Sequence, residues 1–216
     1  MSARIQVARN AREQADSFKI RHRVYCEEQG WERTAADQNE SDHYDVHATH
    51  VVLRDERSVA LGTVRLIPAS TDAVFVVLPI ERCFGASLSK IFPAQTLPDR
   101  RRIAEVSRLA VLPEYRRMLN QPEPTAKEAF PAAMRFCAVQ LFLGALAAAH
   151  KQGAHSLVML MEPKLFRYLR ALGFRHSFAG EPVDHHGLRI PIIAQIDGVM
   201  QSLPPALALE FKRIAG

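Results

Sequence analysis

The 216-residue sequence has few cysteines and no long apolar run, and each shortage excludes a class of protein. Its three cysteines, Cys26, Cys83 and Cys137, form no CxxC pair, which argues against a disulfide framework and against a zinc site. A reducing compartment is the simpler setting. The longest apolar stretch, 137–149, contains Gln140 and is shorter than the roughly 20 residues of a transmembrane helix. The first residues contain no apolar run that could act as a signal peptide. We therefore expect a cytoplasmic protein without a transmembrane segment.

The chain also has little excess of charge of either sign. Lys and Arg number 28 and Asp and Glu 23, which gives a net charge of +5. This mild basic excess fits an acidic partner but is too small to indicate nucleic acid. Apolar residues make up 48% and charged residues 24%, a balance that excludes a wholly disordered chain. The length is typical of one core, so we expect a single domain over 1–216.

The spacing of apolar residues predicts an α/β fold with a mixed sheet and helices on both faces. The segments 34–47 and 81–102 are expected to be irregular. Strands are expected at 4–8, 48–54, 61–68, 73–78, 103–112, 155–161, 174–178 and 188–196. Helices are expected at 11–30, 131–153, 163–172 and 204–214.

A first group of candidate residues lies on the first predicted helix and in the acidic loop after it. Arg21 and Tyr25 are one helical turn apart, and Trp31, the single tryptophan, follows the end of the helix. An arginine facing an apolar stripe needs a carboxylate partner, which Asp42 or Asp45 can supply. The spacing fits either a substrate pocket or a loop-to-helix salt bridge without a catalytic role.

Two further groups lie inside predicted strands. Arg65 interrupts an apolar strand, where a charge is expensive unless it is paired or lies at an edge in water. Glu105 and Arg108 are three residues apart, so they face opposite sides of a regular strand and share a side only if a β-bulge intervenes. A buried carboxylate of this kind has the environment of a general base, although a buried Glu–Arg ion pair explains the pattern equally well.

Taken in order, these motifs resemble the signature of acyl-homoserine-lactone synthases, a branch of the GNAT acyltransferases. Tyr25 stands where that family usually has Phe. Over nearly the whole chain the resemblance is to acyltransferases associated with PEP-CTERM/exosortase systems and to N-acyl amino acid synthases. The signature motifs are Arg21-x3-Tyr25-x5-Trp31, Asp42-x2-Asp45, Arg65 within Gly62-Thr-Val-Arg-Leu, and Glu105-x-Ser107-Arg108. The segments that carry the wider resemblance are 21–26, 40–50, 62–67, 103–111, 161–163, 172–174 and 183–191.

The resemblance implies a GNAT fold whose mixed sheet splays between two parallel strands, here 103–112 and 155–161, with an acyl chain in the gap. It implies transfer of a fatty acyl group from a carrier thioester to the amine of a small amino-acid-like acceptor. Glu105, as general base, and Arg108 would be the catalytic residues. The residues implied in substrate binding are Arg21, Tyr25, Trp31, Asp42, Asp45, Arg65, Ser107 and His186.

The acyl donor is suggested by a missing glycine loop. GNAT enzymes that use acetyl-CoA follow their central strand with a glycine-rich loop that holds the pyrophosphate, whereas this chain has no glycine between Gly85 and Gly144. Acyl carrier protein, which presents a phosphopantetheine thioester, is therefore the expected donor and partner, with acyl-CoA as the alternative. Such carriers are acidic, so a basic surface would match them, although the same arginines fit an ordinary solvated patch. These arginines are Arg100, Arg101, Arg102, Arg116 and Arg117.

Other functions remain open at this level. The motifs also permit an autoinducer synthase using S-adenosylmethionine, an acetyl-CoA-dependent acetyltransferase, or a non-catalytic binder of an acidic partner. Asp184, His185 and His186 fit a hairpin turn better than a metal site. We expect neither a metal nor a permanently bound cofactor.

Overall fold

The computed structural model describes residues 3–69, 77–116, 137–174 and 177–216 and divides into two compact units. The first unit comprises Met1–Arg65 and Arg108–Ala145, and the second comprises Leu66–Ser107 and Leu146–Gly216. Strands β3 (Ala60–Pro68) and β4 (Ile103–Val111) and helix α5 (Cys137–Lys151) each run through both units.

In the first unit, β1 (Arg4–Val7) and β2 (Thr49–Arg54) pair antiparallel, from Arg4 opposite Arg54 to Val7 opposite Val51. The strand order continues to β3 and then β4. The core is built on buried strand residues and on α5, which is apolar on almost every side. At Gly144 an added Cβ would lie 2.8 Å from Val51 Cγ1, so only glycine fits against β2 there.

Helix α1 (Ala11–Arg21) begins at Asn10, whose side chain accepts a hydrogen bond from the Glu13 amide. A π-helix, His22–Glu28, follows it without a break, so the expected single α-helix over 11–30 is wrong in its second half. The chain then turns at Gly30, which has a φ of 63°. Helices of the π type are rare and concentrate at functional sites.

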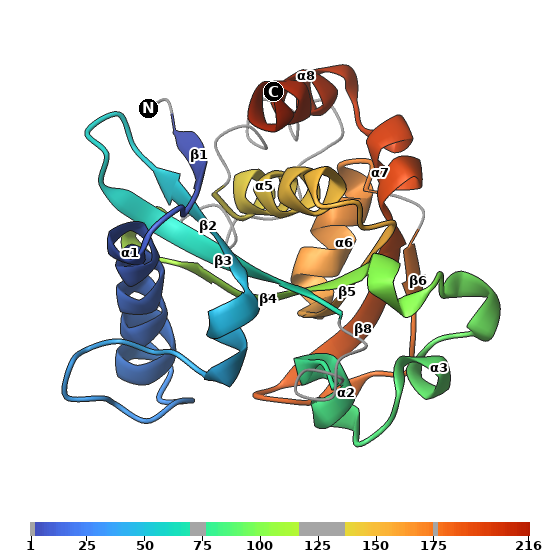
Figure 1. Cartoon of the computed structure of the whole chain (residues 1–216), viewed down its shortest axis with the longest axis horizontal. Coiled ribbons are helices and arrows are strands. Elements are labelled where there is room, and N and C mark those ends of the chain that lie inside the picture. Colours follow the sequence, from blue (N-terminus) through green and yellow to red (C-terminus); the bar gives the residue numbers. More distant parts are fainter. Residues whose placement is uncertain (1–2, 70–76, 117–136, 175–176) are drawn as a thin grey trace. The chain divides into compact units, whose positions relative to one another are not determined.

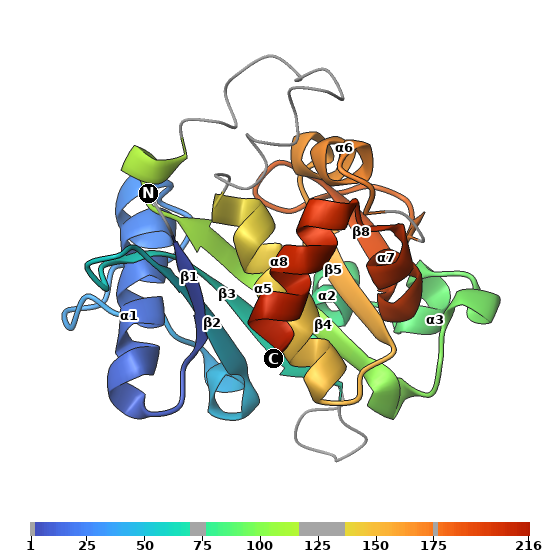
Figure 2. The same cartoon turned by 90° about the horizontal axis from the view of Figure 1, so that it is seen from above.

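The second unit contains the other halves of β3 and β4, followed in the sheet by β5 (Ser156–Met161), β8 (Leu188–Gln195) and β6 (Ser177–Ala179). β4 and β5 are parallel, from Ile103 opposite Ser156 to Val106 opposite Met159. β5 and β8 are antiparallel and lie side by side in both views (Figures 1 and 2). The short β7 (Val183–Asp184) pairs with the start of β8. The helices of this unit are α2 (Pro79–Phe84), α3 (Leu88–Ile91), α6 (Pro163–Ala171), α7 (Ile196–Ser202) and α8 (Pro205–Ala215).

The predicted mixed α/β fold and its parallel strand pair are confirmed. The expectation of irregular structure over 81–102 is wrong, because this segment contains the end of α2, all of α3 and two 3-10 turns. Proline at the first position of α2 and Glu81 two positions later were the available signals. The expected strand 73–78, the first part of the expected helix 131–153, and Arg117 lie wholly or mainly outside the described residues. Across the described part of the chain, no helix is both long and apolar enough to cross a membrane.

Candidate functional site

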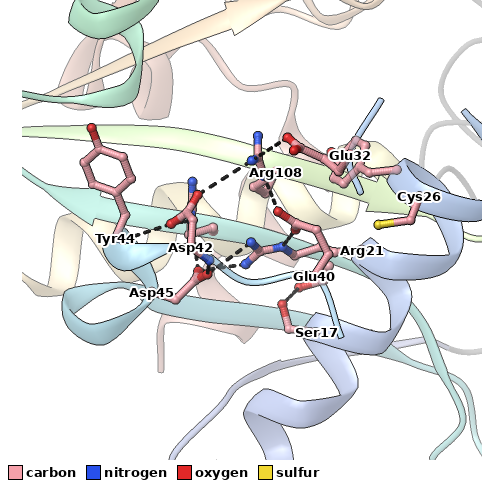
Figure 3. A network of polar contacts seen from close by, with 12 residues as sticks. Ser17, Arg21, Cys26, Glu32, Glu40, Asp42, Tyr44, Asp45 and Arg108 are labelled. Carbon is pink, nitrogen blue, oxygen red and sulfur yellow. Dashed lines mark hydrogen bonds and ion pairs between the residues drawn. The ribbon is translucent and has the colours of Figure 1, made fainter. Parts of the chain in front are cut away.

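Arg21, at the C-terminal end of α1, is the centre of a buried ion-pair network in the first unit (Figure 3). Its side chain is completely buried. Nε donates to Glu40, and the two terminal nitrogens donate to Asp45 over 2.7 and 3.1 Å. Burial alone would lower the pKa of Arg21, but the two carboxylates outweigh it and raise that pKa. The guanidinium therefore stays charged within the core.

The Asp42-x2-Asp45 motif works as a capping box on a 3-10 helix, His43–His47. The Asp42 side chain accepts from the Tyr44 amide (2.9 Å), and the Asp45 side chain accepts from the Asp42 amide (2.7 Å). This local fold places both carboxylates on Arg65 of β3, which donates to Asp42 over 2.6 Å and to Asp45 over 2.9 Å. Burial would raise the pKa of Asp45, but its hydrogen bonds to Arg21 and the charges of Arg21 and Arg65 lower it to about 2.

Arg108 of β4 joins the same network from another strand. Its guanidinium donates to Glu32 over 2.8 Å and to Glu40 over 3.2 Å, and it lies 3.6 Å from Asp42. Arg108 also lies over the ring of Tyr25, 5.6 Å from its centroid. The network therefore contains three positively charged arginines and four negatively charged carboxylates.

Tyr25 and Trp31, two of the predicted substrate-binding residues, form an aromatic pair in the structure. Their rings stack with centroids 5.9 Å apart. The Tyr25 hydroxyl donates to the carbonyl of Leu109 over 2.8 Å, which ties the π-helix to β4. Burial raises the pKa of Tyr25 to about 12, so its hydroxyl remains a donor at neutral pH.

A β-bulge interrupts β4 at Arg108. The amide of Leu112 donates to Leu61, and the amide of Ala69 donates to Ile103. Between these bonds β3 advances eight residues and β4 advances nine, so β4 contains one extra residue. Arg108 has a φ of 51°, which is costly for a residue with a side chain and marks the bulge. The β-bulge that the spacing of this motif called for is therefore present in β4.

Glu105 belongs to the second unit and is only 3% exposed. Its Oε2 accepts a hydrogen bond from the amide of Ile80 in α2 over 3.0 Å. The thiol of Cys83, also on α2, has its pKa raised by burial and further by the negative charge of Glu105. Ser107 follows directly after Val106, where the parallel pairing of β4 with β5 ends. That is where the resemblance implies the splay.

His186 belongs to the second unit and is far from these residues in the sequence. It is exposed in the turn between β7 and β8. Its φ is 53°, and the His185 amide donates to the Gly187 carbonyl over 3.0 Å. The expected hairpin turn is confirmed, and the binding role of His186 stays a prediction.

The arginines expected to meet a carrier protein are paired within the chain wherever the structure describes them. Arg100 is three-quarters buried and holds a buried carboxylate with both terminal nitrogens, so its position is that of an internal ion pair. Arg101 and Arg102 are exposed and keep their surface position. The pairs are Arg100–Glu81, Arg101–Asp99, Arg102–His155 and Arg116–Glu28.

Sequence reasoning missed Glu40, which lies between two arginines at the centre of the network. Glu40 is 6% exposed and accepts from both Arg21 and Arg108. The available signal was the charge count, since two aspartates leave three motif arginines short of a negative partner.

A buried polar chain also lies behind Asp45 and was not predicted. His50 is fully buried, with Nδ1 3.1 Å from Ser17 Oγ and Nε2 3.6 Å from Asp45 Oδ1. Ser17 in turn shares a 2.7 Å hydrogen bond with Thr63. Burial lowers the pKa of His50 more than the charge of Asp45 raises it.

Comparison with known proteins gives a consistent class. Residues 20–120 match the family model "Acetyltransferase (GNAT) domain". An acyl-homoserine-lactone synthase of Acinetobacter nosocomialis is 29% identical over 168 residues, which cover 77% of this chain and 82% of that protein. The structure of MesI, a CoA-dependent acyl-homoserine lactone synthase, aligns with a TM-score of 0.62 at 19% identity over 99% of this chain and 95% of the other. FeeM, an N-acyl amino acid synthase from uncultured soil microbes, aligns with a TM-score of 0.60 at 18% identity over 94% and 97%.

Residues 20–120 thus match a GNAT acetyltransferase domain, and the chain is similar to acyl-homoserine-lactone synthases and to an N-acyl amino acid synthase. The predicted GNAT fold is confirmed, and so is the prediction of an acyltransferase enzyme. The predicted resemblance to these synthases is confirmed, and the predicted association with PEP-CTERM systems stays a prediction.

Proposed function

We propose that this protein transfers a fatty acyl group from an acyl carrier thioester to the amine of a small amino-acid-like acceptor, with Glu105 as general base. The observation that carries the proposal is a buried carboxylate, Glu105, on the strand whose bulge presents Arg108. We propose further that the two units form one acyltransferase domain, because β3, β4 and α5 each run through both.

The chemistry requires a base because an ammonium ion has no lone pair with which to attack. Glu105 takes a proton from the acceptor ammonium, directly or through a water molecule. The freed amine attacks the thioester carbonyl, so a C–N bond forms and the C–S bond breaks. The carrier leaves as a thiol after taking up a proton. A backbone N–H that the bulge releases from the sheet would stabilise the oxyanion of the tetrahedral intermediate.

The charge balance of the network supports an acceptor that carries a positive group. Three guanidiniums face four carboxylates, so the cluster keeps one net negative charge. Arg21 and Arg65 are buried and donate to carboxylates of the chain itself, so they would give the acceptor pocket its shape. Arg108 is the most exposed of the three arginines, with 25% of its side chain exposed, and would bind the carboxylate of the acceptor. Tyr25 and Trp31 would supply an aromatic wall.

The remaining binding roles follow the same assignment. Asp42 and Asp45 would shape the acceptor pocket together with Arg21, and Ser107 and His186 would line the substrate path. Exposed Arg101 and Arg102, together with Arg116, are the described arginines suited to an acidic carrier protein.

Acyl carrier protein is the proposed donor because the glycine loop typical of CoA-dependent enzymes is missing from the sequence. Acyl-CoA is the alternative donor, which is favoured by the likeness to CoA-dependent MesI. Use of a carrier thioester places the enzyme in the cytoplasm. The resemblance to exosortase-associated enzymes further suggests that the gene lies near an exosortase gene, which inspection of the neighbouring genes decides.

A second candidate function is synthesis of an acyl-homoserine lactone from S-adenosylmethionine. The sequence match to an acyl-homoserine-lactone synthase over 77% of the chain favours it. The two functions give different products, because the second releases a lactone and methylthioadenosine whereas the first yields an acyclic N-acyl amino acid.

The experiment incubates purified protein with acyl carrier protein or CoA thioesters of several chain lengths. The acceptors are a mixture of amino acids or S-adenosylmethionine, and products are identified by mass spectrometry. The proposal predicts N-acyl amino acids that depend on acyl carrier protein and disappear in Glu105→Gln. The matched control, exposed Glu56→Gln, should keep full activity. Absence of acyl transfer with every donor and acceptor would overturn the proposal.

A further inference from the structure

Glu81 is a buried carboxylate in the second unit that the proposed chemistry does not use. It is 5% exposed and lies in the first turn of α2. It accepts from the amide of Leu78 before the helix (2.9 Å) and from the amide of Leu88 at the start of α3 (3.0 Å). Arg100 donates to its two oxygens over 2.9 and 2.6 Å. One carboxylate therefore joins three separate parts of the chain.

The protonation of Glu81 agrees with a structural ion pair. Burial would raise its pKa, but the hydrogen bond from Arg100 and those from the two amides outweigh burial and lower it. Glu81 thus stays ionised at neutral pH, and the bidentate contact with Arg100 fixes the orientation of its carboxylate plane.

The first turn of α2, which contains Glu81, also contacts the proposed base, Glu105. Ile80 precedes Glu81 directly, and its amide donates to Glu105 Oε2. Any rotation or shift of the start of α2 moves this amide away from Glu105. The position of the Glu105 carboxylate is therefore coupled to the Glu81–Arg100 pair through only a few backbone bonds.

We propose that Glu81 and Arg100 are positioning residues for Glu105, which they orient through the Ile80 amide at the start of α2. This proposal rests on the proposed function for its catalytic consequence, although the positioning itself is independent of any activity. It also gives Arg100 a different role from carrier binding, which is left to the exposed arginines.

Kinetics separate the two roles of Arg100. A positioning role predicts that Arg100→Ala lowers kcat about ten-fold or more and leaves the KM for the acyl donor unchanged, since small displacements of a catalytic group are costly. Arg100→Lys keeps the charge but not the bidentate contact and should recover part of the rate. Arg82→Ala, an exposed arginine on the same helix, is the matched control and should behave as wild type. A raised KM with unchanged kcat in Arg100→Ala would show carrier binding and overturn the proposal.

Cys83 provides a readout that needs no activity. Its thiol lies on α2 and is partly exposed, and burial together with the negative charge of Glu105 raises its pKa. Glu105→Gln should therefore lower the Cys83 pKa and speed alkylation of its thiol at pH 7. The pKa is read from the pH dependence of iodoacetamide labelling at the Cys83 peptide by mass spectrometry.

The decisive comparison repeats Glu105→Gln in an Arg100→Lys background. If Arg100 positions Glu105, the shift of the Cys83 pKa shrinks or disappears in that background. An equal shift in both backgrounds, or no shift in the wild-type background, would overturn the proposal. Because the labelling is independent of substrate, a protein with no acyl transfer activity but with the predicted thiol coupling would refute the proposed function and leave the positioning of Glu105 intact.

Discussion

Replacing Asp45 by Asn removes one negative charge from the centre of the buried network and leaves the shape of the side chain almost unchanged. Asp45 is 8% exposed and accepts hydrogen bonds from Arg21, Arg65 and the Asp42 amide. The arginines lower its pKa from an ordinary 3.8 to about 2. At about 1.4 kcal/mol per pKa unit, the charge stabilises the folded state by about 2 kcal/mol. The amide also brings N–H donors toward two guanidiniums, so we expect a loss of about 2 to 4 kcal/mol.

The pH dependence of this loss follows from the direction of the pKa shift. A carboxylate whose pKa is lowered by folding stabilises the protein fully above its unfolded pKa, near 4, and loses this effect as the pH falls through 2. The difference between wild type and Asp45→Asn should therefore be constant from pH 5 to pH 7. At pH 3 the charge contribution should have fallen to about half, or about 1 kcal/mol.

The assay is urea unfolding of both proteins at pH 7 and pH 3, followed by circular dichroism. Asp197→Asn, which alters an exposed aspartate of α7, is the control and should change stability by less than about 0.5 kcal/mol. A loss at pH 7 as small as that of the control would refute the assigned role of Asp45. A loss of equal size at pH 3 and pH 7 would show that the charge is not the cause.

Three further substitutions test other parts of the first unit. Tyr25→Phe removes the hydrogen bond to the Leu109 carbonyl and should cost about 1 kcal/mol, seen as a fall in Tm of about 2–4 °C, with acyl transfer kept; an unchanged Tm would contradict the contact. Gly62→Ala places a Cβ 2.9 Å from the Ala110 carbonyl oxygen and should cost about 1–3 kcal/mol in urea unfolding, whereas a neutral result would show that the site has room. Folding lowers the pKa of His50, so its imidazole stays neutral in the folded protein at a pH where it is protonated in the unfolded chain, below about pH 6.5. Wild-type stability should therefore fall between pH 7 and pH 5, and this slope should be shallower in His50→Gln; equal slopes would exclude His50 as its source.

The fold was largely predictable because its signals are local. Proline at the start of α6 and glycine after its end mark that helix, and two largely apolar runs on either side of the charged turn 55–58 mark β2 and β3. The π-helix was not predictable, because His22–Glu28 has the same residue spacing as a continued α-helix. Tyr25 of this helix bonds to the Leu109 carbonyl of β4, a contact between distant residues that no local pattern encodes.

Several members of the buried network could be predicted from the sequence, whereas Glu40 and most of the contacts between members could not. The spacing of Asp42 and Asp45 is a local capping box, so it is visible in sequence. The role of Glu40 depends on arginines that are 19 and 68 residues away, and no local pattern encodes such a contact. The partner of Arg100 was missed for the same reason, since Glu81 lies 19 residues earlier in a helix that was itself missed.

The most direct test of the central claim compares lipid extracts from bacteria that express wild type, Glu105→Gln or the control Glu56→Gln. All three proteins are first shown to be folded and equally abundant. Acyl transfer with Glu105 as base predicts long-chain N-acyl products in the extracts of wild type and the control and none with Glu105→Gln, and the product masses identify chain and acceptor. N-acyl products that persist undiminished in Glu105→Gln would contradict the claim.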